Sequence, residues 1–221
     1  MVELLVAMVV SLLALAAIYS TFLAQHRSYQ VQEETAGMQQ NIRTAMYYME
    51  REIRMAGNDP FNTGNFGFVS GTSTANANVI QFTEDIGDGA GGPPDGILNA
   101  NETISYNLDA NRNLVRTVGG GAPVVVAQNI DALDFVYLNG SSPPIPLNSG
   151  GGGVSLPLYN QIQSVQITVV ARTDDPLLYG TTNNNTYANQ QGQTIYAPPA
   201  PGDNVSRRRL TTLINCRNIG L

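Results

Sequence analysis

The chain has 221 residues, of which 43% are hydrophobic and only 13% are charged. This length fits one modest domain with an appendage, or two small domains. The formal net charge is −6, and a nucleic acid-binding protein needs a basic face, so nucleic acid is excluded as an expected partner. The single cysteine, Cys216, and the single histidine, His26, exclude an intrachain disulfide and any metal site built from several thiols or two imidazoles.

The chain divides into two parts of different composition. Residues 2–55 contain no proline and one glycine, Gly37, whereas Gly, Pro, Asn, Ser and Thr recur in clusters from Gly57 onward. This contrast predicts one long helix followed by a domain of strands and loops. We expect three regions: an apolar half-helix over residues 1–24, an amphipathic half-helix over 25–57, and a mainly β domain over 58–221.

The first half of the predicted helix is apolar enough to enter a membrane. From Leu4 to Ala24 there is no charged residue, and only Ser11, Ser20 and Thr21 are polar. At 1.5 Å per residue this stretch reaches about 31 Å, which matches the hydrocarbon core of a bilayer. The sequence therefore predicts a membrane anchor.

Two other interpretations of this stretch are a cleaved secretory signal peptide and a plain transmembrane anchor. The small residues 14–16 resemble a cleavage site, but the basic n-region of a signal peptide is absent and the apolar run continues past them. The nearest basic residues, His26 and Arg27, follow the apolar run, which by the positive-inside rule would place the large domain in the cytoplasm. A basic leader before Met1 would reverse this orientation.

The second half of the predicted helix is amphipathic. Apolar residues recur at intervals of three, four and seven and mark one stripe, which we expect to dock on the following domain. Gly57 and the pair Asp59-Pro60 are expected to end the helix. The stripe consists of Val31, Met38, Ile42, Ala45, Met46, Met49 and Ile53.

The start of the chain resembles a known family. The run Val2-Glu3-Leu4-Leu5-Val6-Ala7-Met8 is similar to the start of mature type IV pilins and pseudopilins. Residues 38–60 (MQQNIRTAMYYMEREIRMAGNDP), 130–137 (IDALDFVY) and 217–221 (RNIGL) resemble the PilW-type minor pilins. The resemblance implies a pilin-like α+β fold, with the long helix packed on an antiparallel sheet domain.

The resemblance also implies a function, a place and partners. It implies a minor pilin that resides in the bacterial inner membrane before assembly, with its domain in the periplasm. It then enters an extracellular type IV pilus or its initiating tip complex, with other pilins and the assembly machinery as partners. A type II secretion pseudopilin shares the fold and the opening motif. An alternative of another class is a membrane-anchored periplasmic domain that binds a ligand or a surface.

Glu3 is the residue of most interest in the opening motif. A lone carboxylate beside an apolar helix is costly unless it is paired, and the resemblance implies that it pairs with the N-terminal amine of a neighbouring subunit. The alternative is an interfacial carboxylate at headgroup level. The predicted assembly residues are Glu3, Leu4, Leu5, Val6 and Ala7.

The region after Pro60 is predicted to be mainly β, with antiparallel strands and one face covered by the helix. Two long segments, residues 139–160 and 173–206, are rich in Gly, Asn, Thr and Pro and are expected to be loops. The expected strands are 79–82, 104–108, 114–118, 123–130, 133–137, 162–169 and 207–217.

An acidic segment is a candidate calcium site. Asp95, Gly96 and Glu102 have the spacing of the second half of a calcium-binding loop, but Gly91 and Pro93 stand where the first two acidic ligands belong. Asp85 or Asp88 could fold back to complete the ligands, and ligands that are all oxygen favour Ca²⁺. The alternative is an ordinary solvated Asp/Gly/Asn turn. The candidate ligands are Asp85, Asp88, Asp95 and Glu102.

The sequence does not favour an enzyme. No histidine follows Pro60, so a Ser-His-Asp or Cys-His arrangement in the domain has no base. Asp131 with Asp134, or Asp174 with Asp175, offers a carboxylate pair, but the chain has no Trp to form the wall of a sugar-binding cleft. The run 207–209 (RRR) is expected to form local salt bridges rather than an anion site.

Overall fold

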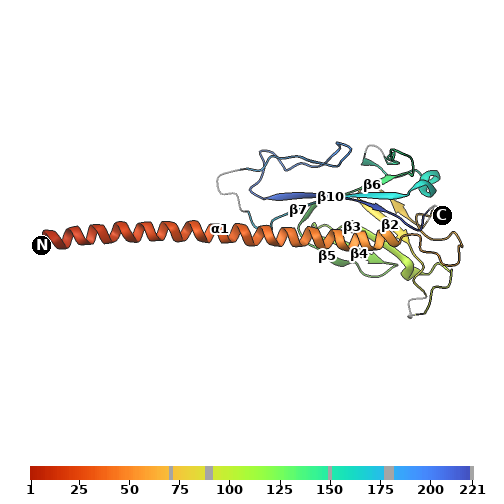
Figure 1. Cartoon of the computed structure of the whole chain (residues 1–221), viewed down its shortest axis with the longest axis horizontal. Helices are drawn as coiled ribbons and strands as arrows, with labels where there is room; N and C mark the ends of the chain where they lie inside the picture. Colours follow the sequence, from red (N-terminus) through yellow and green to blue (C-terminus); the bar gives the residue numbers. More distant parts are fainter. Residues whose placement is uncertain (70–71, 88–91, 149–150, 177–181, 220–221) are drawn as a thin grey trace.

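The computed structural model describes residues 1–69, 72–87, 92–148, 151–176 and 182–219. One straight helix, α1, runs from Val2 to Met55 and extends far beyond the rest of the molecule (Figure 1). Gly57 ends it with a positive φ of 78°, a conformation that glycine adopts without a steric penalty. Its backbone N–H donates to the Thr83 carbonyl, so the chain passes directly from the helix to the sheet.

Two antiparallel sheets form most of the domain, with strand orders β1-β2-β3-β4-β5 and β10-β7-β6 in the described residues. The Phe135 N–H donates to the Ala77 carbonyl and joins the two sheets. The strands of the first sheet are β1 (Thr74–Ala75), β2 (Val79–Thr83), β3 (Thr103–Leu108), β4 (Leu114–Val118) and β5 (Val124–Ala127). Those of the second are β6 (Ile130–Leu138), β7 (Ser164–Arg172) and β10 (Arg207–Asn215).

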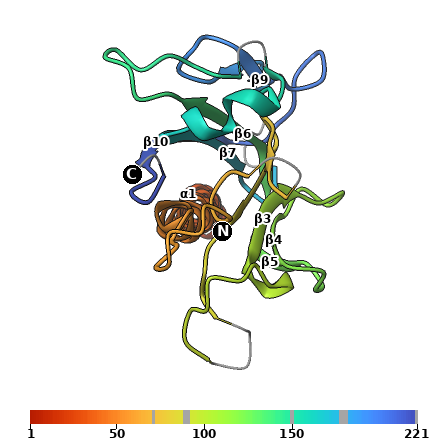
Figure 2. The ribbon, with the colours of Figure 1, turned by 90° about the vertical axis from the view of Figure 1, so that its right-hand side faces the viewer.

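The helix lies in the angle between the two sheets and contacts β5, β7 and β10 (Figure 2). Its buried side chains meet aromatic and aliphatic residues of both sheets, including Phe82, Tyr106 and Phe135. The long helix packed on antiparallel sheets confirms the predicted α+β fold. The helical residues in this core are Met38, Ile42, Ala45, Met46, Met49 and Ile53.

The predicted apolar stripe on the helix is confirmed except at its start. Val31 is 42% exposed, so the prediction that it packs against the domain is wrong. The domain reaches back along the helix only to Glu34, whose carboxylate accepts a hydrogen bond from the backbone N–H of Asp174 at 3.0 Å. Every residue of α1 before Glu34 is exposed, and Met38 is the first residue of the helix that is buried.

The predicted strands occur, but several boundaries differ: β7 is Ser164–Arg172 instead of 162–169, β10 ends at Asn215 instead of 217, and the division between β5 and β6 is misplaced. Ile130 begins β6 instead of ending the preceding strand, because Asn129 adopts a left-handed φ of 57° and turns the chain between β5 and β6. Every residue of β6 is buried, although its alternating pattern predicted one exposed face. Asn189 of the hairpin β8 (Tyr187–Ala188) and β9 (Thr194–Tyr196) accounts for part of this burial, since its amide donates to Asp134.

The two long segments predicted as loops contain short regular elements. A 3-10 helix, η3, spans Leu156–Gln161 within the first segment, and the β8–β9 hairpin lies within the second. A further 3-10 helix, η1, spans Ala100–Glu102 directly before β3.

Candidate functional site

The described part of the domain buries no residue in the first half of α1. Every residue from Met1 to Glu33 is exposed, and the apolar window of this helix has 0% of its residues buried. Within the described part of the chain, α1 is the one helix that is long and apolar enough to cross a membrane. In water, this much uncovered apolar surface is costly, so a bilayer or another apolar helix must cover it.

The polar side chains of the apolar half are already paired within the helix. Ser11 donates to the Ala7 carbonyl at 2.8 Å, and both Ser20 and Thr21 donate to the Ala17 carbonyl. A hydroxyl without a partner in hydrocarbon would cost several kcal/mol. These internal bonds make the segment compatible with an apolar environment along its length.

The predicted assembly residues lie together at the free end of the helix. Glu3 occupies the first turn of α1, where the positive end of the helix dipole favours a carboxylate. About 46 Å of helix, at 1.5 Å per residue, separates Glu3 from the start of the domain at Glu34. The domain of its own chain therefore cannot supply a partner for Glu3, and a second molecule is needed. The exposed residues beside it are Leu4, Leu5, Val6 and Ala7.

Aromatic residues mark the end of the apolar half. The rings of Phe22 and His26 meet edge to face with centroids 6.2 Å apart, and Tyr19 and Tyr29 are exposed nearby. Rings of this kind, followed by a charged residue such as Arg27, are typical of the boundary between a bilayer and water.

A charged cluster fixes the docked half of the helix to the first sheet. Glu52 accepts hydrogen bonds from Arg116 at 2.8 Å and from the Tyr106 hydroxyl at 2.5 Å. Burial, together with the hydrogen bond to Glu52, raises the pKa of Tyr106, and the Glu52 bond raises that of Arg116. Burial and the nearby Glu52 carboxylate raise the pKa of Glu84 to about 7. The sequence analysis missed this cluster, because its members lie far apart in the chain.

The acidic segment brings three of its four predicted ligands together. Carboxylate oxygens of Asp85, Asp95 and Glu102 lie within 4.8 Å of one another, with Asp85 and Glu102 buried and Asp95 exposed. The fourth predicted ligand, Asp88, lies outside the described residues. Gly96 has a φ of 75°, so it makes the turn that the predicted loop places there.

Backbone N–H groups already donate hydrogen bonds to these carboxylates. Glu102 accepts from Ile86 and Gly87 at 3.1 Å each and from Asn99 at 2.6 Å. Asp85 accepts from the N–H groups of Asp95 and Gly96. These bonds are sufficient to hold the carboxylates close together without a cation, and the Glu102 Oε1 that accepts from Ile86 and Gly87 has both lone pairs engaged. Calcium binding stays a prediction.

The basic run at the start of β10 forms the predicted local salt bridges at Arg207. Its side chain is 1% exposed and pairs with Asp131 and Asp203, each at 2.5 Å. The Arg207 guanidinium also lies 4.7 Å from the centre of the Tyr196 ring. Arg207 therefore ties β10 to β6 and to the 182–206 segment.

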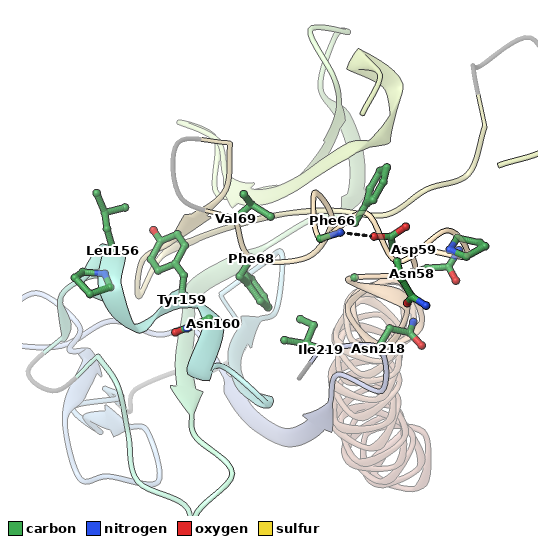
Figure 3. A pocket seen from close by; sticks show the side chains of 15 residues that line it. Asn58, Asp59, Phe66, Phe68, Val69, Leu156, Tyr159, Asn160, Asn218 and Ile219 are labelled. Carbon is green, nitrogen blue, oxygen red and sulfur yellow. Dashed lines mark hydrogen bonds between the residues drawn. The ribbon is translucent and has the colours of Figure 1, made fainter. Parts of the chain in front are cut away.

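A cleft of about 1030 Å³ opens at the end of the domain farthest from the free helix (Figure 3). The chain forms it from three separate places: the turn after α1, η3 and the residues that follow β10. No sequence pattern predicted it. Its lining residues include Asn58, Asp59, Phe66, Phe68, Tyr159, Asn218 and Ile219.

Comparison with known proteins gives limited information. No protein-family model and no curated protein sequence matches the chain. Among solved structures, the chain is similar to a type IV-like pilin from Thermus thermophilus, with 14% sequence identity and a TM-score of 0.46. The match covers 82% of this chain and 97% of that one. A similarity of this size does not by itself assign a function.

Proposed function

We propose that the chain is a pilin subunit, a structural protein that is held in a membrane by the first half of α1 and then packs that half against other subunits in a filament. The observation that carries this proposal is the apolar half-helix with Glu3 at its free end, which no part of the domain covers. A signal peptide would not need to continue as one unbroken helix into the docked half, where six side chains between Met38 and Ile53 are buried.

The finer proposal is a minor pilin of the PilW type. It rests on the sequence resemblance of residues 2–8, 38–60 and 130–137, and places the unassembled subunit in the bacterial inner membrane with its domain in the periplasm. In the assembled pilus or its tip complex, the half-helices form the core and the β domain faces outward. A type II secretion pseudopilin would have the same fold, and purification of the pilus would separate the two proposals.

The test uses Glu3→Ala in the full chain, with Glu33→Ala as the matched control on the exposed helix outside the apolar half. Removing one member of a buried ion pair costs about 3–5 kcal/mol, so the amount of Glu3→Ala in sheared filaments should fall at least about tenfold. Its amount in the membrane fraction should not change, because Glu3 lies at the edge of the anchor.

Two outcomes would contradict parts of this proposal. Normal incorporation of Glu3→Ala into filaments would show that Glu3 has no role in assembly. Absence of the unmodified chain from purified filaments, with normal amounts in the membrane, would favour a membrane-anchored domain that binds a ligand or a surface and never polymerises.

A further inference from the structure

Two oppositely charged side chains, Asp59 and Arg43, have hydrogen-bonding capacity that the described residues leave unused. They lie at different positions along the long axis of the molecule. The Asp59 carboxylate lines the distal cleft, and its Oδ2 accepts hydrogen bonds from Thr63 and from the Gly64 N–H at 2.8 Å. Its Oδ1 is buried and has no hydrogen-bond partner. A buried oxygen without a donor is uncommon in folded proteins and calls for an explanation.

The matching cation is on the outer face of α1, defined by the exposed residues Gln40, Arg43, Tyr47 and Arg51. Two other arginines of the docked half are engaged within the chain. Arg54 donates to Glu50 at 2.6 Å, and Arg51 lies close enough to Glu84 to act on its carboxyl group electrostatically. Arg43 is exposed and makes no hydrogen bond or ion pair with the described residues.

Arg43 and Asp59 of one chain cannot meet. They are separated by about 20 Å, since twelve helical residues at 1.5 Å each lie between Arg43 and Met55 and the turn to Asp59 follows. Two parallel copies displaced by about 20 Å along the helix axis would bring the Arg43 of one level with the Asp59 of the other. Their apolar half-helices, each about 31 Å long, would still overlap by about 10 Å.

We propose that the distal cleft of one copy receives Arg43 from the outer helix face of a second copy, with the guanidinium on the Asp59 carboxylate. This inference rests on the proposed function and names a contact between filament subunits. Asp59 is partly exposed and lines the cleft, so a donor that enters the cleft can approach its carboxylate. The buried aromatic floor, which includes Phe66 and Phe68, supports the aliphatic part of an arginine side chain.

The contact joins different surfaces on the two copies. In a pair of copies, one copy still has a free cleft and the other still has a free Arg43. The contact can therefore be repeated with further copies and can propagate along a filament. Arginine and tyrosine are the residues that most often dominate such interfaces, and Tyr47, which is 62% exposed, lies one turn from Arg43.

Cysteine cross-linking between two full-length copies tests the contact in the membrane. One copy carries Arg43→Cys, the other carries Asp59→Cys, and mild oxidation is followed by non-reducing electrophoresis. A disulfide needs Cα atoms within about 7 Å, so these positions cannot cross-link within a chain. The native Cys216 is buried in both copies. The matched control replaces Arg43→Cys by Glu33→Cys, an exposed position on the same helix.

The proposal expects several-fold more dimer from the pair at 43 and 59 than from the pair at 33 and 59. Equal yields would overturn it, as would an equal yield of dimer from Arg43→Cys alone, which would indicate contact between like helix faces. In a second measurement, Arg43→Glu and Asp59→Arg should each reduce incorporation into filaments, and the double variant should restore it. A double variant no better than either single one would also overturn the proposal.

Failure of this contact and failure of the proposed function are distinguishable. A chain present in filaments without the cross-link refutes only the cleft contact. A chain that forms the cross-link in the membrane but is absent from filaments refutes only the filament role.

Discussion

The two halves of α1 share one unbroken helix and differ in what surrounds them. In the half that ends near Ala24, no side chain is buried, although nearly all are apolar. In the half that ends at Met55, six side chains are buried in the core of the domain. The comparison shows that one helix can have its own domain around one half and an uncovered apolar surface on the other, and the proposed function assigns that surface to a membrane and then to another subunit. The predictions below test that division.

The largest effect, on membrane association, is expected from removal of the apolar half of α1, residues 1–24. A chain that begins at Gln25 should leave the membrane fraction entirely and be soluble and monomeric, because residues 1–24 make no contact with the domain. It should keep one cooperative thermal unfolding transition, measured by circular dichroism. A truncated protein that stays aggregated without detergent would contradict this division of the helix.

Methionine truncation compares the two halves directly. Met49 is 0% exposed, so Met49→Ala should lower the free energy of unfolding of the domain by about 2–5 kcal/mol. Met8 is 60% exposed, and Met8→Ala should change it by less than about 0.5 kcal/mol. Denaturant titration of both full-length variants in the same detergent gives the measurement. Similar losses in the two variants would show that the free half also stabilises the domain.

The free energy of unfolding should depend on pH through Glu84, which lies at the junction between the helix and the first sheet. Its pKa is raised from 4.5 to about 7 in the folded chain, so the folded state holds this proton more tightly than the unfolded state. The contribution of this proton to the free energy of unfolding is complete below pH 4.5 and is lost as the pH rises through about 7. The loss is at most about 3 kcal/mol.

Glu84→Gln should remove this loss, so that stability no longer falls between those pH values. Glu33→Gln, which changes an exposed carboxylate on α1, is the control and should keep the profile of the unmodified chain. A profile of Glu84→Gln that still falls toward pH 7 would assign the effect to another group.

The acidic segment is a smaller and separate test at the distal end of the domain. If Asp85, Asp95 and Glu102 hold calcium, the ion at ten times its Kd should stabilise the chain by about 1.4 kcal/mol, or a few degrees of melting temperature. Glu102→Gln should abolish this shift. It should also lower the melting temperature in chelator, because Glu102 organises three backbone N–H groups. Identical melting curves with calcium and with chelator would leave a purely structural acidic turn.

The smallest effect is expected at Gly37, directly before the first buried residue of α1, Met38. Gly37 is exposed, and a Cβ added there would meet no atom within 4 Å. Gly37→Ala should therefore stabilise the helix by about 0.5–1 kcal/mol through the lower entropy of the unfolded chain. The measurement is the thermal midpoint of the full chain. A decrease would indicate that flexibility at this position matters to the folded state.

Local patterns were sufficient to predict the helix and most of the strands. The absence of proline from residues 2–55, followed by Gly57, predicted α1 to within two residues of its end at Met55. The spacing of Asp95, Gly96 and Glu102 also predicted that these residues share one loop, and the structure brings two of them together with Asp85. Such patterns act over a few residues, where helix and turn geometry decide which side chains can meet.

Contacts between distant parts of the chain were not predictable in this way. Val31 has the spacing of a core residue but stays exposed, because the described contacts of the domain reach along the helix only to Glu34. Both faces of β6 are buried, since a hairpin more than fifty residues away donates from Asn189 to Asp134. The distal cleft needs three segments at once, and neither its existence nor the unpaired Oδ1 of Asp59 has a local signature.

The sequence by itself determined the long helix, the apolar character of its first half and the α+β class. Hydrophobic length and periodicity are properties of consecutive residues, so they survive without knowledge of the fold. Only the tertiary structure decided where the domain stops along the helix, which carboxylates are buried, and which charged groups remain without a partner. Those properties depend on which distant segments pack together, because burial and pairing are set by neighbours in space rather than by neighbours in the chain.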